Sequence, residues 1–215
     1  MTMPQPRLRP WLLALGICVA VVLICVQWVD RPVADWSAAH FGGTAAFALG
    51  RGFLRLSEPV FVAVVAFVIG CGAWRLSGGP LPSWTQLPLR CGISMTVAFL
   101  VMAALKVAFG RSPASPLYLV DGVYVFRPFH GGTTFGALPS GTMSVGTAAL
   151  AVLWIQSVRL RLLSVLGWVL LAASLIVTNS HWVGDIVAGS FLGAASGSLP
   201  MRLPRFDGAP ASGKR

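Results

Sequence analysis

Three short polar segments of the sequence carry residues suited to phosphate chemistry. Lys106 and Arg111 come at the end of one long apolar run, and the segment Pro139-Ser140-Gly141-Thr142 comes at the start of the next. His181 lies four residues before Asp185, so both side chains share one face of a helix. Cationic side chains and the N–H groups at a helix start bind phosphate oxygens, and an imidazole held by a carboxylate is a basic nucleophile. Together these segments predict a site that handles phosphate groups.

Each segment taken alone also has a structural explanation. A lysine at the end of an apolar run commonly extends to the membrane surface, and Pro-Ser-Gly begins many helices. An aspartate in a first helical turn interacts favourably with the helix dipole. However, an ionisable His–Asp pair that enters a membrane is costly without a function, and the three segments are expected at one membrane face. We therefore favour the functional interpretation.

The composition indicates an integral membrane protein. Of 215 residues, 56% are hydrophobic and 10% are charged, whereas a soluble domain carries about 25% charged residues. This excludes a soluble globular enzyme, a disordered protein and a secreted disulfide scaffold. The net charge of +10 comes from basic residues in short clusters between apolar runs. Because these residues form no stripe interleaved with aromatic side chains, we predict no nucleic-acid partner.

Six apolar segments predict an all-α bundle of six transmembrane helices in a single membrane domain over residues 1–215. The segments exceed strand length and lack period-two alternation, so helices are favoured over a barrel. The connection 30–58 is expected to lie along the membrane surface or dip into it, 110–141 is a long loop, and 204–215 is a short polar tail. The first segment is predicted to be an uncleaved span. The predicted spans are 11–29, 59–75, 91–109, 142–158, 162–179 and 183–199.

The distribution of basic residues predicts the orientation in the membrane. One side receives ten Lys and Arg residues with one acidic residue, and the other side receives six with five acidic residues. Basic residues are enriched on the cytoplasmic side. We therefore predict a multi-pass protein of the cell (inner) membrane with both termini in the cytoplasm and the phosphate-handling segments on the extracytoplasmic face.

At these segments the sequence resembles the type 2 phosphatidic acid phosphatase superfamily of membrane lipid phosphatases, which is related to vanadium-dependent haloperoxidases. That family shows Lys-x6-Arg-Pro, then Pro-Ser-Gly-His, then Ser-Arg-x5-His-x3-Asp. The resemblance covers residues 106–189, where the matching positions are Lys106, Pro139, Ser140, Gly141, Ser174, His181 and Asp185.

The resemblance implies hydrolysis of a lipid phosphate or diphosphate, without a metal or other cofactor, on the extracytoplasmic face. His181 would attack phosphorus to give a phosphohistidine, and Asp185 would orient it. The phosphoryl oxygens would be bound by Lys106, Arg111, Ser140, Gly141 and Thr142. The expected partners are the lipid substrate and membrane lipids, and the same intermediate could be passed to a lipid acceptor by a phosphotransferase.

Three positions depart from the family pattern. Pro113 occupies the arginine position of the first motif, Thr142 replaces the histidine that protonates the leaving group, and Leu175 replaces the arginine of the third motif. General-acid assistance contributes typically about 10²–10⁴-fold. A diphosphate leaves as phosphate and needs less protonation, so a lipid diphosphate such as a polyprenyl diphosphate is the favoured substrate. Alternatively, His130 or His40 supplies the proton.

Two function classes besides an enzyme stay open. The same scaffold could bind a phospholipid or a partner without turnover, because three motif residues are replaced. A transporter is the third option, although no pair of interrupted spans in matching halves supports it.

Overall fold

The computed structural model describes residues 8–130 and 134–199, and this part of the chain is almost entirely helical. The predicted polar tail at 204–215 lies outside the described residues. The longer helices are α1 (Leu8–Ile24), α2 (Asp30–Phe41), α3 (Ala45–Leu76), α4 (Gln86–Phe109), α6 (Gly141–Gln156), α7 (Arg161–Val177) and α8 (Val183–Ser198). The short elements are η1 (Cys25–Val29), η2 (Ser83–Thr85), η3 (Ala114–Tyr118), α5 (Leu119–Asp121) and η4 (Val158–Leu160).

The predicted all-α fold is confirmed, because the described residues contain no strand beyond one isolated bridge between Arg111 and Phe126. Within them, four helical runs are long and apolar enough to cross a membrane. They are Arg9–Phe41, Ala45–Leu76, Ser83–Phe109 and Val158–Val177. Helices α6 and α8 have 16 residues each, which is about 24 Å of helix against a hydrocarbon core of about 30 Å. Six complete spans therefore stay a prediction.

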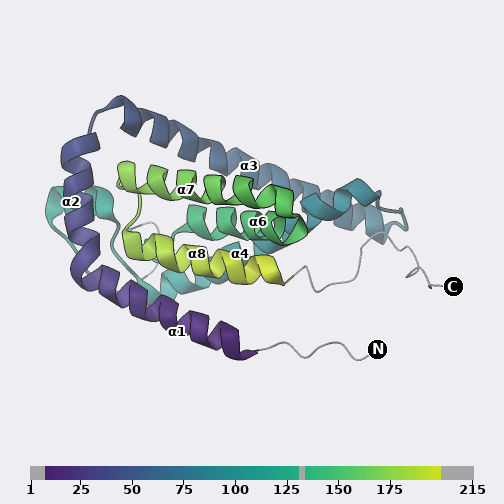
Figure 1. The fold of residues 1–215 in the computed structure, drawn as a ribbon, viewed down its shortest axis with the longest axis horizontal. Coiled ribbons are helices and arrows are strands. Elements are labelled where there is room, and N and C mark those ends of the chain that lie inside the picture. Colours follow the sequence, from purple (N-terminus) through teal and green to yellow (C-terminus); the bar gives the residue numbers. More distant parts are fainter. Residues whose placement is uncertain (1–7, 131–133, 200–215) are drawn as a thin grey trace.

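Helices α4, α6, α7 and α8 form a bundle, in which α6 and α8 approach closely (Figure 1). Glycines four residues apart on α8 make this approach possible. A Cβ atom added to Gly189, Gly193 or Gly197 would lie 2.8, 2.5 or 2.7 Å from a carbonyl oxygen of Ser140, Ser144 or Ala148, respectively. Stripes of small residues allow close backbone contact between helices in membranes, and this one fixes α8 against α6.

Helices α1 and α2 are joined by the π-turn Cys25–Val29, and α2 then crosses the end of the bundle (Figure 1). Trp11 of α1 packs edge-on against Phe191 of α8, with ring centroids 6.3 Å apart. Ser37 of α2 donates a hydrogen bond of 2.7 Å to the carbonyl of Ile176 at the end of α7. The connection predicted at 30–58 is therefore helix α2 followed by the first turns of α3.

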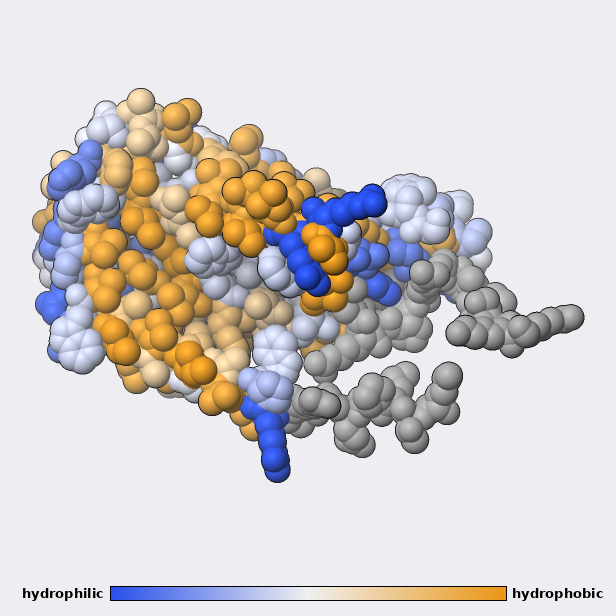
Figure 2. Space-filling model, in the orientation of Figure 1, coloured by the Kyte–Doolittle hydropathy of each residue, from blue (hydrophilic) through white to orange (hydrophobic). Residues whose placement is uncertain are grey.

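The outer surface of the protein is apolar along the length of the helices. Figure 2 shows hydrophobic residues across the middle of the visible face and hydrophilic residues toward its ends. Large side chains such as Leu13, Leu23 and Leu162 are more than half exposed. In water such a surface would drive aggregation, but it suits a hydrocarbon environment.

We expect Gly193→Val to lower the unfolding temperature in detergent, because its side chain would collide with the backbone of α6. Overpacking of this kind costs about 1–3 kcal/mol. Gly16→Val on α1 is the matched control, since nothing lies within 4 Å of its added Cβ. Thermal unfolding followed by tryptophan fluorescence tests the prediction, and equal unfolding temperatures for the two variants would contradict it.

Candidate functional site

The structure brings the three predicted segments together at one end of the bundle. Helix α4 ends at Phe109, and the following Gly110 adopts a left-handed conformation (φ 57°), in which a Cβ would clash with the carbonyl of Arg127. The chain continues directly into Arg111, whose carbonyl accepts a hydrogen bond of 3.1 Å from the N–H of Ala137. The N–H of Ser140 donates to the carbonyl of Asp185 at 3.0 Å. Backbone hydrogen bonds thus connect the segment after α4 and the starts of α6 and α8.

His181 and Asp185 form the predicted pair. The imidazole Nδ1 lies 3.4 Å from Oδ2 of Asp185, at the long end of hydrogen-bond range. The same carboxylate oxygen accepts the N–H of Trp182 at 3.2 Å, so its position is fixed by the backbone. The Asp185 side chain is fully buried, whereas that of His181 is 15% exposed. Because the carboxylate contacts Nδ1, Nε2 is the nitrogen available for chemistry.

Arg111 lies in a buried cluster with two carboxylates. Its Nη1 donates to Oδ1 of Asp185 at 2.6 Å, and its Nη2 pairs with Asp30 and donates to the Tyr124 hydroxyl at 2.8 Å. Asp30 also accepts the N–H of Gly184 at 2.9 Å. Burial lowers the pKa of Arg111, but the neighbouring carboxylates of Asp185 and Asp30 raise it by more. The pKa of Arg111 therefore lies above its usual value. The guanidinium therefore stays charged.

This geometry bears on the predicted role of Arg111. Its side chain is about 1% exposed, and both terminal nitrogens already contact carboxylates. Arg111 is also not among the residues that line the cavity next to His181, which is described below. A role for Arg111 in binding phosphate stays a prediction, and the contacts favour a positioning role in which it holds Asp185 behind His181.

His181 lines a polar cavity of about 410 Å³ at this end of the bundle. Thr142, in the first turn of α6, also lines it, and its role as a phosphate ligand stays a prediction. The other lining residues were not predicted as site residues, although Leu175 was already noted as a replaced motif position. They are Arg51, Leu54, Arg55 and Ser57 from α3, with Leu175 and Ser180. The sequence did contain a signal for two of them. Arg51 and Arg55 are four residues apart on the predicted extracytoplasmic side, where basic residues are less common.

A second, apolar cavity of about 450 Å³ adjoins the first. Ser57 and Thr142 line both cavities. The apolar cavity lies among α3, α4, α6 and α7, and its side chains include Val60, Phe61 and Phe99. A molecule with a charged head and an apolar chain can therefore place its two parts in adjoining spaces.

The remaining predicted site residues lie around the start of α6. Lys106 Nζ would be 3.9 Å from a Cβ added to Gly141, so its ammonium lies beside the first turn of α6. Ser140 is fully buried and caps α6, because its hydroxyl accepts the N–H of Met143 at 3.4 Å. Lys106 is not among the residues that line either cavity, Gly141 lines the apolar cavity, and Thr142 lines both. A role for these three residues in binding an anion stays a prediction, and the Ser140 hydroxyl is engaged in the helix cap.

The two alternative histidines lie away from the polar cavity. Nδ1 of His40 is 2.8 Å from the carbonyl of Trp36, whose indole stacks on its ring. Nδ1 of His130 is 3.1 Å from the carbonyl of Pro128. Neither ring is among the residues that line the cavity with His181. Across residues 8–130 and 134–199, no three His, Cys, Asp or Glu side chains are grouped so that they could hold a metal.

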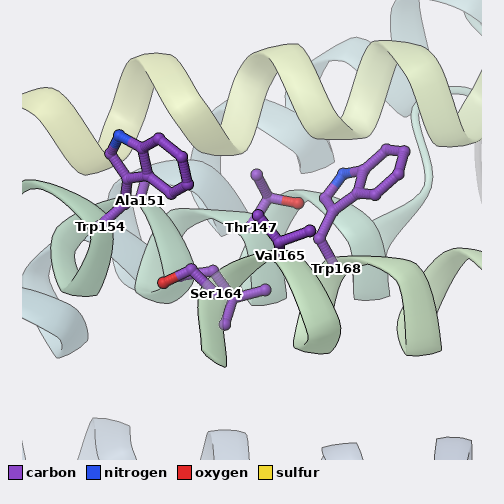
Figure 3. A pocket seen from close by; sticks show the side chains of 7 residues that line it. Thr147, Ala151, Trp154, Ser164, Val165 and Trp168 are labelled. Atoms are coloured by element: carbon purple, nitrogen blue, oxygen red, sulfur yellow. The ribbon is translucent and has the colours of Figure 1, made fainter. Parts of the chain in front are cut away.

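A smaller apolar pocket of about 200 Å³ lies between α6 and α7 (Figure 3). Thr147, Ser164 and two tryptophans, Trp154 and Trp168, line it. It contains none of the predicted site residues, so we do not assign it to the reaction.

Comparison with known proteins identifies the family. Residues 87–207 match the family model of the PAP2 superfamily. This chain belongs to the PAP2 superfamily. A curated relative of this PAP2 protein, lipid A 1-phosphatase of Rhizobium johnstonii, is 25% identical over 204 residues, which cover 88% of this chain and 79% of the relative. No solved structure matches the chain. The family and this relative support a lipid phosphatase and confirm the resemblance found in the sequence.

Two of the three positions that depart from the PAP2 pattern line the cavity with His181. Leu175, where the third motif has arginine, is 1% exposed and packs with Met143 and Ile186 while it lines the His181 cavity. Thr142, where the second motif has histidine, lines both cavities. This PAP2 protein therefore retains the imidazole and its carboxylate but has apolar or hydroxyl side chains at two places where the motif is basic.

We expect Arg111→Gln to destabilise the protein strongly, because it leaves Asp30 and Asp185 buried without a cation. Removing one partner of a buried ion pair costs about 3–5 kcal/mol. Asp30→Asn should cost less, since it leaves Arg111 paired one-to-one with Asp185. Unfolding temperatures in detergent measure both effects, with Arg127→Gln, whose guanidinium stacks on Phe135, as the control. If Arg111→Gln were as stable as the control, the cluster would not have the role assigned to it.

Proposed function

We propose that this protein is a membrane phosphatase that removes the terminal phosphate of a lipid phosphate or diphosphate, with His181 as the nucleophile. The observation that carries the proposal is the position of His181. Its ring is backed by the buried Asp185 carboxylate and faces a polar cavity that shares a wall with an apolar one. The match to the PAP2 superfamily and to a lipid A 1-phosphatase supports the same reaction class.

The two adjoining cavities suit the two parts of a lipid phosphate. The polar cavity of about 410 Å³ would take the phosphate group, and the apolar cavity of about 450 Å³ would take part of the hydrocarbon chain. Binding sites of this kind use apolar walls for affinity and a few polar groups for orientation. Because Thr142 lines both, it would lie near the bond between the head group and the chain.

The proposed reaction has two steps. Nε2 of neutral His181 attacks phosphorus, the bond from phosphorus to the leaving oxygen breaks, and a phosphohistidine forms. Asp185 stabilises the imidazolium through Nδ1, and Arg111 and the N–H of Trp182 hold the carboxylate in place. Water then hydrolyses the phosphohistidine to inorganic phosphate. Lys106 and the first-turn N–H groups at Gly141 and Thr142 would stabilise negative charge on the phosphoryl oxygens.

The lining of the polar cavity favours a diphosphate substrate. Among the described residues that line it, the side chains besides the arginines are hydroxyl, apolar or His181 itself. None of these is a good proton donor to an alkoxide, and a general acid contributes typically about 10²–10⁴-fold. A phosphate leaving group needs little protonation. We therefore favour a lipid diphosphate such as a polyprenyl diphosphate over phosphatidic acid.

We also propose that the reaction takes place on the extracytoplasmic face of the cell (inner) membrane, with both termini in the cytoplasm. The charge distribution supports this orientation. Helix α1 begins and α8 ends at the end of the bundle away from α2 and the starts of α6 and α8 (Figure 1).

A binding protein without turnover is the second candidate. Three motif residues are replaced, and Leu175 and Thr142 present no basic group where the family motif has one. Such a protein would hold the same lipid phosphate in the same cavities. A lipid phosphotransferase is a variant of the enzymatic proposal, with a lipid acceptor instead of water in the second step.

We expect His181→Ala to reduce phosphate release from farnesyl diphosphate by at least about 10³-fold, because it removes the nucleophile. His130→Gln is the control and should retain the wild-type rate. Purified protein in detergent and colorimetric phosphate detection measure the rates. Equal background rates for wild type and His181→Ala would contradict the enzymatic proposal and favour the binding protein.

We expect farnesyl diphosphate to be hydrolysed faster than dioctanoyl phosphatidic acid by the wild-type protein. Thr142→His restores the motif histidine and should raise the rate on phosphatidic acid by about 10²-fold, with a smaller effect on the diphosphate. The ratio of kcat/KM values for the two substrates is the readout. A wild-type protein that prefers phosphatidic acid would overturn the diphosphate assignment.

A further inference from the structure

Helix α3 docks against the end of α7 beside the His181 cavity. A Cβ added to Gly50 would lie 3.1 Å from Cγ2 of Thr178 and 3.6 Å from the backbone of Ser174, so α3 approaches the backbone of α7 closely here. One turn later, Leu54 packs against the buried cluster that contains Leu175. The contact therefore forms at the third-motif position, where the family has arginine and this chain has leucine.

This docking brings Arg51 and Arg55 to the wall of the cavity. They flank Leu54 and are four residues apart, so they lie on one face of α3. The guanidinium of Arg51 lies 5.3 Å from the centre of the Phe47 ring. Among the side chains that the structure describes, ion pairs join Arg111 to Asp30 and Asp185, and His181 to Asp185. Neither α3 arginine is part of these pairs. Within the part of the chain that the structure describes, no carboxylate therefore competes with an anion in the cavity for these two guanidinium groups.

The motif positions leave the cavity short of cations. Pro113 and Leu175 occupy the two motif arginine positions, and Arg111 is held by Asp30 and Asp185. A phosphate group carries one to two negative charges, and a diphosphate carries more, so binding in a partly apolar cavity requires compensating charge. The lining of the polar cavity contains two permanent cations, and both come from α3.

We propose that Arg51 and Arg55 bind the phosphate or diphosphate group of the lipid and thereby replace the two missing motif arginines. The inference rests on the proposed function, because the group they bind is the one presented to His181. Each guanidinium offers five N–H donors in a planar fork that matches phosphate oxygens. With two such groups one helical turn apart, the clamp suits a diphosphate better than a single phosphate.

The clamp also accounts for basic residues on the predicted extracytoplasmic side of α3. This helix lies before the region that matches the PAP2 model, which begins at residue 87. The helix that binds the anion is thus separate from the part of the chain that carries His181 and Asp185.

Binding to the His181→Ala protein tests the clamp without turnover. Isothermal titration calorimetry in detergent with farnesyl diphosphate and with dioctanoyl phosphatidic acid gives Kd for the parent and for added Arg51→Gln or Arg55→Gln. Loss of one charged hydrogen-bonding partner should raise Kd about tenfold or more, with the larger effect for the diphosphate. Arg51→Lys and Arg55→Lys should retain more affinity than the glutamine variants, because they keep the charge. Arg127→Gln is the matched control and should not change Kd.

The outcomes separate the clamp from the catalytic proposal. Weaker binding in both glutamine variants but not in the control supports the clamp. This holds even if the wild-type protein shows no turnover in the phosphate-release assay. Unchanged Kd in the glutamine variants overturns the clamp, and equal weakening in Arg127→Gln overturns it too, since the effect would then be general surface charge. Because Arg51 and Arg55 are exposed, elution of the variants as monodisperse protein is expected and is checked by size-exclusion chromatography.

Discussion

The buried arginine between two carboxylates is the interaction on which the arrangement of the site depends. Asp30 begins α2, Arg111 follows α4, and Asp185 lies in the first turn of α8. Because an unpaired buried charge is expensive, these three segments can be buried only together. Once Arg111 compensates Asp185, that carboxylate keeps its second oxygen for His181 and the N–H of Trp182. The cluster thus fixes the His–Asp pair through contacts that no local segment could supply.

The sequence predicted the four helices of the bundle well because a backbone in hydrocarbon must satisfy its own hydrogen bonds. It predicted 59–75 as a span, whereas α3 begins 14 residues earlier, at Ala45. The apolar runs at 91–109, 142–158, 162–179 and 183–199 lie on α4, α6, α7 and α8 with ends that differ by at most five residues. The connection 30–58 was less predictable. Its polar and small residues give no sustained apolar run, yet Ser37, Asp30 and Gly50 dock it onto the bundle by single contacts. Such contacts exist only after the bundle has formed.

The candidate site also contains some residues that the sequence predicts and others that only tertiary packing reveals. Lys106, residues 139–142 and the His181–Asp185 pair were predictable, since their spacing or position at helix ends already indicates anion chemistry. The partners of Arg111 were not, because Asp30 lies 81 residues away in the chain. Arg51 and Arg55 were also missed, because their place beside His181 depends on the packing of Leu54 against the Leu175 cluster. Local patterns thus identified the residues that we propose as reactive groups, and tertiary packing decided which cations line the cavity with His181.

The replaced motif residues change the electrostatics around the cavity and leave His181 and Asp185 in place. Loss of a basic group at position 142 removes a proton donor, and an apolar side chain at position 175 removes a charge. Two arginines from α3 return positive charge at a different wall of the cavity. Fixed cations stabilise a departing phosphate, whose charge is spread over several oxygens, better than they assist an alkoxide, which needs a proton at one atom. On the proposed function, a site with cations in place of an acid would favour diphosphates over phosphate esters, while the His181 imidazole and the Asp185 carboxylate are kept.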